Sequence, residues 1–311
     1  MKARRTRFGL LLVTLLGMSC SKEAQSPSIF PIKNPSEVIP TQTPTTGPYY
    51  HTLRTASSAD GLTWTEDRSD DLVLHASVPA AVQLNDGTLI VYFVDFSSGS
   101  PERLGCVVSK DDGTTFSWGN CSVSGLTSNK AVDFAPFLLQ DGSVRLYFYA
   151  SDVNVNSAGA HAIDYSTSSD GISFTRTATV FSYNGLVDPD VFYNGTDWIM
   201  HVFSLTDGAT VRAAGSDGLD FTYLDQLQPP NYGVTKPVLL PDNTFRMYGF
   251  PQGANQQNRF VSMHSTDGYS WNLDTGNRLV APSGYETTDP YVIRLTSGKW
   301  FMVFKRSPSG K

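Results

Sequence analysis

Ser58-Ala-Asp60-Gly61-Leu-Thr-Trp64 is the first of five similar segments in this chain, each with an aspartate and a glycine followed by an aromatic residue. The other four are Ser109-Lys-Asp-Asp-Gly-Thr-Thr-Phe116, Ser168-Ser-Asp-Gly-Ile-Ser-Phe174, Gly215-Ser-Asp-Gly-Leu-Asp-Phe221 and Ser265-Thr-Asp-Gly-Tyr-Ser-Trp271. A repeat of about 50 residues made of short strands and tight turns is typical of a radial or stacked array. The repeat therefore indicates the architecture before any chemistry is considered.

A second element alternates with these turns. It is an apolar run that begins with a proline, then a polar turn, then a run rich in aromatic residues. The copies begin at Pro79, Pro136, Pro189, Pro237 and Pro290. Asp-Gly or Asn-Gly between two apolar runs is the strongest short signal for a β-hairpin. Each repeat is thus interpreted as two hairpins, and four strands per unit make one blade of a propeller.

The two ends of the chain complement each other. Residues 50–67 form an outer hairpin without an inner one, and residues 289–305 form an inner hairpin without an outer one. Together they complete a fifth blade and leave no unpaired edge in the ring. The sequence predicts an all-β fold, a five-bladed β-propeller with four-stranded blades.

The Asp-Gly turns allow a structural and a ligand-binding interpretation, and the structural one is favoured. An aspartate side chain accepts backbone N–H bonds within its own turn, and glycine supplies the left-handed backbone conformation. The aromatic residue that follows packs between neighbouring sheets. These turns are expected on the outer strands, away from the channel.

Composition and charge narrow the class of protein. The 311 residues are 40% hydrophobic, which is enough for one large core, and the net charge is −6. Without the four basic residues near the N-terminus the net charge is about −10. The remaining chain has no basic run, so nucleic acid is excluded as a partner.

Residues 1–19 resemble a signal peptide, with a basic start and an apolar core that is too short to span a membrane. Gly17-Met-Ser-Cys20 resembles a bacterial lipobox, which implies lipid modification of Cys20; ordinary secretion is the alternative. Residues 20–48 are rich in Ser, Pro and Thr and are expected to be a tether. The predicted propeller covers 49–311, as a monomer held by its lipid at the membrane of the bacterial cell envelope.

Two cysteines remain in the body of the chain. Cys106 and Cys121 lie on either side of the second Asp-Gly turn, about equally far from its centre at Gly113. Symmetric positions in a hairpin face each other across the strands. In an exported chain they are expected to form a disulfide; two buried thiols are the alternative.

The innermost strand of each blade is expected to line the channel, so ligands should bind where these strands begin. Blade two has Asp133 near its proline, blade three has Asp188 and Asp190, blade four has Lys236, and blade five has Glu286 and Asp289; blade one has no charge there. Paired carboxylates are the groups that glycosidic cleavage needs. The five histidines lack metal-ligand spacing, so no metal site and no cofactor are predicted, and a calcium ion in the channel stays an open alternative.

Five blades, the "DP" strand openings, the "APF" of blade two and the Asp-Gly-x-x-aromatic turns together resemble the glycoside hydrolases of families 43 and 32. The second turn also matches the Asp-box motif of sialidases and related propellers, where the box is structural. The resemblance covers residues 50–306. It implies an enzyme that cleaves glycosidic bonds at the channel mouth with carboxylates borne on different blades.

Family 43 has an aspartate opening blade one, an aspartate opening blade three and a glutamate opening blade four. In plain order this sequence matches only at Asp188, because Val78 and Lys236 occupy the other two positions. If blade five is counted first, Asp289 takes the position of the base. Asp133 then takes that of the modulator, three residues before its proline, and Asp188 or Asp190 takes that of the acid.

Four further residues are candidates for binding a sugar: Lys236, Gln252, Asn255 and Glu286. Gln252 and Asn255 lie in a loop dense in amides, which pair well with hydroxyl groups. The expected partner is an oligo- or polysaccharide. Two alternatives remain open, a glycan-binding lipoprotein without catalysis and a protein-binding propeller of the envelope.

Overall fold

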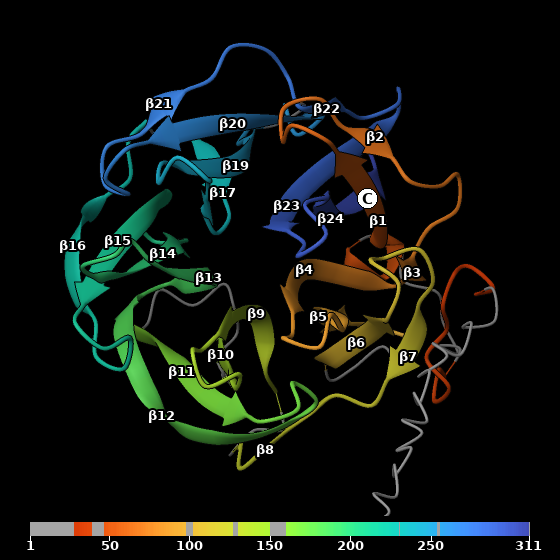
Figure 1. The fold of residues 1–311 in the computed structure, drawn as a ribbon, viewed down its shortest axis with the longest axis horizontal. Helices are drawn as coiled ribbons and strands as arrows, with labels where there is room; N and C mark the ends of the chain where they lie inside the picture. Colours follow the sequence, from red (N-terminus) through yellow and green to blue (C-terminus); the bar gives the residue numbers. More distant parts are fainter. Residues whose placement is uncertain are drawn as a thin grey trace, which may run out of the picture.

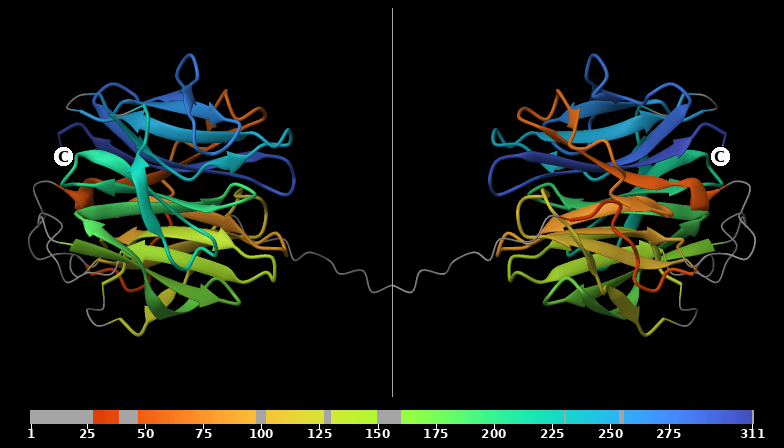
Figure 2. Two further views of the ribbon diagram at one scale, coloured as in Figure 1. Left: turned by 90° about the vertical axis from the view of Figure 1, so that its left-hand side faces the viewer. Right: turned by 90° about the vertical axis from the view of Figure 1, so that its right-hand side faces the viewer.

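The structure is a computed structural model that describes residues 28–38, 47–97, 102–126, 130–149, 160–229, 231–253 and 256–310. Five sheets stand around a central opening (Figure 1). Seen from the side, the ring is a single layer of blades (Figure 2). This arrangement confirms the predicted five-bladed β-propeller.

Blades one to three follow one another along the chain, and each runs from an inner strand to an outer one. Blade one is β4 (Ala76–Gln83), β5 (Leu89–Asp95), β6 (Arg103–Ser109) and β7 (Ser117–Gly119). Blade two is β9 (Val132–Leu138), β10 (Val144–Tyr149), β11 (Ala160–Ser168) and β12 (Ser173–Asn184), with the short β8 (Ser122–Ser124) parallel to β12. Blade three is β13 (Leu186–Tyr193), β14 (Trp198–Ser204), β15 (Ala209–Gly215) and β16 (Thr222–Gln226).

Blade four has an interrupted inner strand. It consists of β17 (Tyr232–Val234), β18 (Val238–Leu239), β19 (Phe245–Pro251), β20 (Arg259–Ser265), β21 (Asn272–Leu273) and β22 (Leu279–Val280).

Blade five joins the two ends of the chain, as predicted. It consists of β23 (Tyr285–Arg294), β24 (Trp300–Pro308), β1 (Thr52–Ser58), β2 (Thr65–Glu66) and β3 (Val73–Leu74), and a short 3-10 helix, Pro48–Tyr50, precedes β1. β1 and β24 pair in unbroken register from Thr52 opposite Arg306 to Ser58 opposite Trp300. This pairing closes the ring, because each end covers the edge that the other leaves open.

The Asp-Gly turns hold their own backbone. In the first, Asp60 Oδ1 accepts the N–H groups of Leu62 and Thr63, both at 2.8 Å, and Gly61 has φ of +71°. Asp170 and Asp267 accept the corresponding pairs of N–H groups in their turns. These bonds agree with the structural interpretation of the turns.

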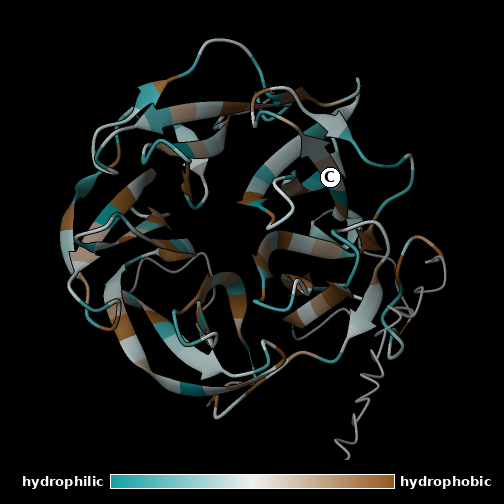
Figure 3. Ribbon diagram, viewed as in Figure 1, coloured by the Kyte–Doolittle hydropathy of each residue, from teal (hydrophilic) through white to brown (hydrophobic). Residues whose placement is uncertain are grey.

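Three of the turns are also bonded to the preceding blade. Tyr92 donates its hydroxyl to the carbonyl of Gly171 (2.7 Å), Tyr147 to that of Gly218 (2.8 Å), and Tyr248 to that of Gly61 (2.6 Å). The three tyrosines are fully buried, and each such bond contributes about 1 kcal/mol to stability. The hydrophobic side chains of the strands pack between the blades, while the loops around the rim are more hydrophilic (Figure 3).

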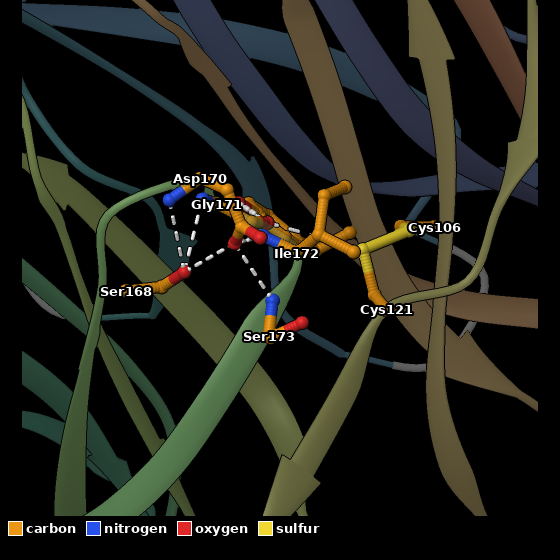
Figure 4. Close-up of a disulfide and its surroundings, with 8 residues drawn as sticks. Cys106, Cys121, Ser168, Asp170, Gly171, Ile172 and Ser173 are labelled. Atoms are coloured by element: carbon orange, nitrogen blue, oxygen red, sulfur yellow. Dashed lines mark hydrogen bonds between the residues drawn. A yellow bond between two sulfur atoms is a disulfide. The ribbon is translucent and has the colours of Figure 1, made fainter.

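The predicted disulfide between Cys106 and Cys121 is confirmed, with an S–S distance of 2.03 Å. The residue directly opposite Cys106 in the ladder is Gly119, so Cys121 lies just beyond the end of β7. Figure 4 shows the disulfide beside the third Asp-Gly turn, and Cys121 Sγ lies 3.9 Å from the carbonyl oxygen of Gly171. The bridge therefore fixes the point where the chain leaves blade one for blade two.

Part of the segment expected as a tether packs on the propeller. Ile32 is buried and bridges to Val73, and the Ser28 hydroxyl accepts the N–H of Phe116 at 2.8 Å (Figure 1). Residues 28–38 therefore contact both blade five and blade one. The signal peptide and Cys20 lie outside the described residues, and no helix in the described part of the chain is long and apolar enough to cross a membrane.

Candidate functional site

Four of the inner strands share a bulge with an unusual backbone. Its first residue has a left-handed φ: +46° at Val78, +57° at Asp133, and +52° at both Asp188 and Asp289. The strand register skips two residues at each of these points. A left-handed backbone costs a residue with a side chain about 1–3 kcal/mol, and such residues cluster at functional sites.

The register corrects the sequence-based alignment of the blades. The inner strands begin before their prolines, because proline cannot donate to a ladder and tends to occupy bulges. Pro79, Pro189 and Pro290 are the second residues of their bulges, whereas in blade two that place is taken by Phe134. Asp133 therefore matches Asp188 and Asp289 in position, and the predicted displacement of three residues was wrong.

An open pocket lies where the inner strands begin, and its empty space of about 560 Å³ includes the adjoining solvent. All five blades line it, and the bulge residues Val78, Asp133, Asp188 and Asp289 are among its walls. Blade four lacks the left-handed bulge in its described residues and contributes Gly233, Thr235, Phe250 and Gln252 instead. The pocket thus carries four carboxyl groups: Asp133 from blade two, Asp188 and Asp190 from blade three, and Asp289 from blade five.

The three bulge carboxylates form one electrostatic unit. The N–H of Asp188 donates to Asp133 Oδ2 at 3.3 Å, and Asp289 Oδ2 pairs with the Lys305 ammonium at 2.8 Å. Burial raises the pKa of Asp133 to about 7, and the charge of Asp289 adds to the rise. Burial, with the charges of Asp133 and Asp289, raises the pKa of Asp188 well above its usual range. The unit therefore combines two carboxyl groups of raised pKa, Asp133 and Asp188, with a carboxyl group that is paired with a cation.

The deeper part of the channel is closed by side chains from blades four and five. The Lys236 ammonium donates to the carbonyl of Pro136 at 3.3 Å and lies 5.7 Å from the Tyr291 ring. Burial lowers the pKa of Lys236 to about 8, although the charge of Asp190 opposes the fall. Burial raises the pKa of Asp190 well above its usual range, and the Lys236 charge and main-chain N–H oppose the rise.

The structure brings together most of the predicted site residues but not all of them. Asp133, Asp188, Asp190, Asp289 and Gln252 line the pocket. Lys236 lies below it, beside Pro136. Glu286 pairs with Ser307 in blade five and is not among the residues that line the pocket. Asn255 lies outside the described residues.

Two residues near the pocket, Lys305 and His201, were not predicted from the sequence. Lys305 is the partner of Thr288 in blade five, at the ladder position that Tyr149 and Phe203 occupy in blades two and three. The sequence feature that could have identified Lys305 is a lysine where two other blades have an aromatic residue. This feature can be recognised only after the blades have been aligned by their strand register. His201 lines the pocket and is almost completely buried. Within the described ranges, no group of three or more His, Cys, Asp and Glu side chains is arranged to hold a metal ion.

No model of a protein family matches the sequence, and a comparison with curated protein sequences finds no match. Solved structures do resemble it. A Dyadobacter fermentans protein of unknown function has a TM-score of 0.56 at 14% identity, over 83% of this chain and 84% of that one. An exo-β-1,3-galactanase from Phanerochaete chrysosporium has a TM-score of 0.53 at 13% identity, over 82% of this chain and 64% of that one. An α-L-arabinanase from Penicillium chrysogenum has a TM-score of 0.50 at 16% identity, over 76% and 75%.

Identities this low show a common fold and no more. The fold is the five-bladed propeller of these glycoside hydrolases, as the sequence resemblance implied.

Proposed function

We propose that this chain is a glycoside hydrolase that acts in the pocket at the start of its inner strands. The observation that carries the proposal is the placement of Asp133, Asp188 and Asp289 on equivalent left-handed bulges that face one pocket. Strained residues of one chemical type, converging from three blades, point to a reaction that needs several carboxyl groups.

The electrostatics suggest a role for each group. Asp188, whose pKa burial raises well above its usual range, would protonate the oxygen of the leaving sugar as the bond to C1 breaks. Asp289, beside the Lys305 ammonium, would act as the carboxylate that activates water or attacks C1. Asp133 would keep the pKa of Asp188 high through its charge. These roles follow the order of blades in family 43 when blade five is counted first.

The test is a hydrolysis screen of the protein without residues 1–20. The substrates are nitrophenyl α-L-arabinofuranoside, β-D-galactopyranoside and β-D-xylopyranoside, with arabinan and β-1,3-galactan, because similar structures include an arabinanase and a galactanase. Asp188→Asn, purified in the same way, is the matched control. Turnover that the control lacks supports the proposal. Turnover equal in both proteins, or in neither, overturns it.

A glycan-binding protein without catalysis is the second candidate. It is favoured by Lys236, which takes the place of the glutamate that opens blade four in family 43. Binding of arabinan or galactan with no release of sugar would select this candidate. Where turnover occurs, the anomer released first, followed by NMR, tells whether Asp289 acts on water or on the sugar.

We also propose that the mature protein begins at a lipid-modified Cys20 and is held as a monomer at the cell envelope, on a tether that ends where residues 28–38 reach the propeller. The lipobox-like Gly17-Met-Ser-Cys20 and the basic start of the chain support this proposal. Mass spectrometry of the N-terminal peptide should find acyl chains on Cys20. Cys20→Ala should release the protein from membranes, and an unmodified peptide in the membrane fraction would contradict the anchor.

A further inference from the structure

The pocket is not symmetric, because most of its lining residues come from blades three and four. His201, Phe203 and Thr210 line it from blade three, and Thr235 and Phe250 line it from blade four. Blade one contributes only Val78 and Pro79. We call the part of the pocket that blades three and four line the side pocket; it holds two aromatic rings and several polar groups.

Two buried polar side chains in this side pocket have polar atoms without a hydrogen bond. Asp190 is 6% exposed and its Oδ1 has no hydrogen bond, while His201 is 1% exposed and both ring nitrogens have none. The two residues are direct cross-strand partners on β13 and β14, so their side chains lie on the same face of the sheet. An unsatisfied buried polar group costs about 1–3 kcal/mol, which indicates that something completes these bonds.

His201 also breaks a pattern of the ring. Tyr92 and Tyr147 occupy the matching positions in blades one and two, and each donates its hydroxyl to a glycine carbonyl of the next blade. At this position blade three has a histidine instead, which packs against Phe192 and Trp271 with its nitrogens unpartnered. Blade three therefore lacks the hydrogen bond to the next blade that blades one and two make here; blade five, with Val303 at this position, lacks it too.

The His201 ring carries no charge that would select an ion. Burial lowers the pKa of His201 to about 3, so its ring is neutral, with one nitrogen that donates and one that accepts. The Lys236 ammonium is bonded to the Pro136 carbonyl, and neither residue is among those that line the pocket. A hydroxyl group, which donates and accepts at once, is the ligand that such a pair fits.

We propose that Asp190 and His201 form a recognition pair that binds a hydroxyl group of an uncharged sugar ring in the side pocket between blades three and four. Phe203 and Phe250 would contact the apolar faces of that ring. Asp190 is then a specificity residue and not the acid of the reaction. The inference takes the ligand class from the proposed function, but it concerns binding and does not depend on turnover.

The test measures the binding of D-galactose, L-arabinose and D-xylose by titration calorimetry. His201→Phe keeps the ring and removes both nitrogens, and Asp190→Asn keeps the shape of the carboxyl group. Each variant is expected to weaken binding of the best sugar at least about tenfold, and His201→Phe should melt no lower than the wild type. Tyr147→Phe, at the matching position of blade two, is the control and should lower the melting temperature without changing affinity.

Monodeoxy analogues of the sugar that binds identify the hydroxyl group. One analogue should bind the wild type at least about tenfold more weakly than the parent sugar, and His201→Phe should not distinguish the two. Unchanged affinity in both variants would mean that the pair holds water only and would overturn the inference, as would no binding of any of the three sugars. Binding that needs His201 without any hydrolysis would overturn the proposed enzyme and leave this inference standing.

Discussion

The Asp-Gly turns at the rim and the bulges around the channel recur along the same chain, yet they have diverged differently. All five turns keep the aspartate and the glycine. The bulge is missing from the described part of blade four, and where it occurs its first residue is an aspartate in three blades and Val78 in the other. All five turns have the same packing role between blades, whereas each bulge faces the pocket from a different side. Variation within the ring therefore marks the site better than repetition does.

The largest expected effect is a loss of hydrolysis when a bulge residue around the channel is replaced. Asp188→Asn removes the proposed acid, and hydrolysis should fall about 10²–10⁴-fold, or about 3–5 kcal/mol in the barrier. Its melting temperature at pH 7 should not fall, because asparagine keeps the shape of the carboxyl group and adds no charge beside Asp133 and Asp289. Initial rates and calorimetric scans check the two expectations. A variant that loses stability and activity together would place Asp188 with the structural residues.

The next largest effect is a change in how the free energy of unfolding depends on pH when Asp133 is replaced. The pKa of Asp133 is about 7 in the folded protein, against 3.8 for an unperturbed aspartate, so between these values the folded state holds a proton that the unfolded state has lost. Its contribution to stability therefore falls as the pH rises from about 4 to 7, by roughly 4 kcal/mol. Asp133→Asn should gain that much relative to the wild type over the same range. Urea unfolding at pH 4, 5.5 and 7 measures the difference.

The buried histidines do not affect the difference in stability between the wild type and Asp133→Asn. His51 and His201, with pKa values lowered by burial to about 4 and about 3, titrate in both proteins and cancel in the difference. A difference that stays constant with pH would show that Asp133 is charged throughout and would remove it from the electrostatic unit.

Substitutions in the Asp-Gly turns at the rim should change the stability of the protein and not its activity. A Cβ at Gly61 would lie 2.9 Å from the Tyr248 hydroxyl and 3.0 Å from the Trp300 ring. Gly61→Ala should cost about 3 kcal/mol, because it adds a clash to the strain of a positive φ. Gly87→Ala, with φ of +88° and nothing within 4 Å, is the matched control and should cost about 1 kcal/mol. Equal losses in denaturant unfolding would mean that the turns do not bind the blades together.

The smallest effect tests the hydroxyl bond at the ring closure. Tyr248→Phe removes its bond to the Gly61 carbonyl and should cost about 1 kcal/mol, since that carbonyl keeps the Trp64 ring N–H as a partner. Tyr193→Phe, whose hydroxyl bonds to Gly195 at an exposed site, should cost close to nothing. Neither change should affect hydrolysis. A loss of activity in Tyr248→Phe with an unchanged melting temperature would contradict the division between rim and channel.

Much of the fold could be predicted because it rests on local chemistry. Asp-Gly turns adopt few conformations, and their spacing sets the number of blades and the phase of the two ends. The pairing of Cys106 with Cys121 followed from their symmetry about one turn. The strand openings were less certain, because a proline can start a strand or occupy a bulge, and this choice misplaced Asp133.

The sequence by itself determined that this chain forms five four-stranded blades closed by its two ends, because turn chemistry and alternating apolar runs act over a few residues. Only the tertiary structure decided which side chains meet at the channel. The left-handed bulges turn Asp133, Asp188 and Asp289 toward one pocket, and the register sets Asp190 beside His201. These groups are far apart in sequence, and their protonation depends on burial and on neighbouring charges, which exist only once the ring is closed.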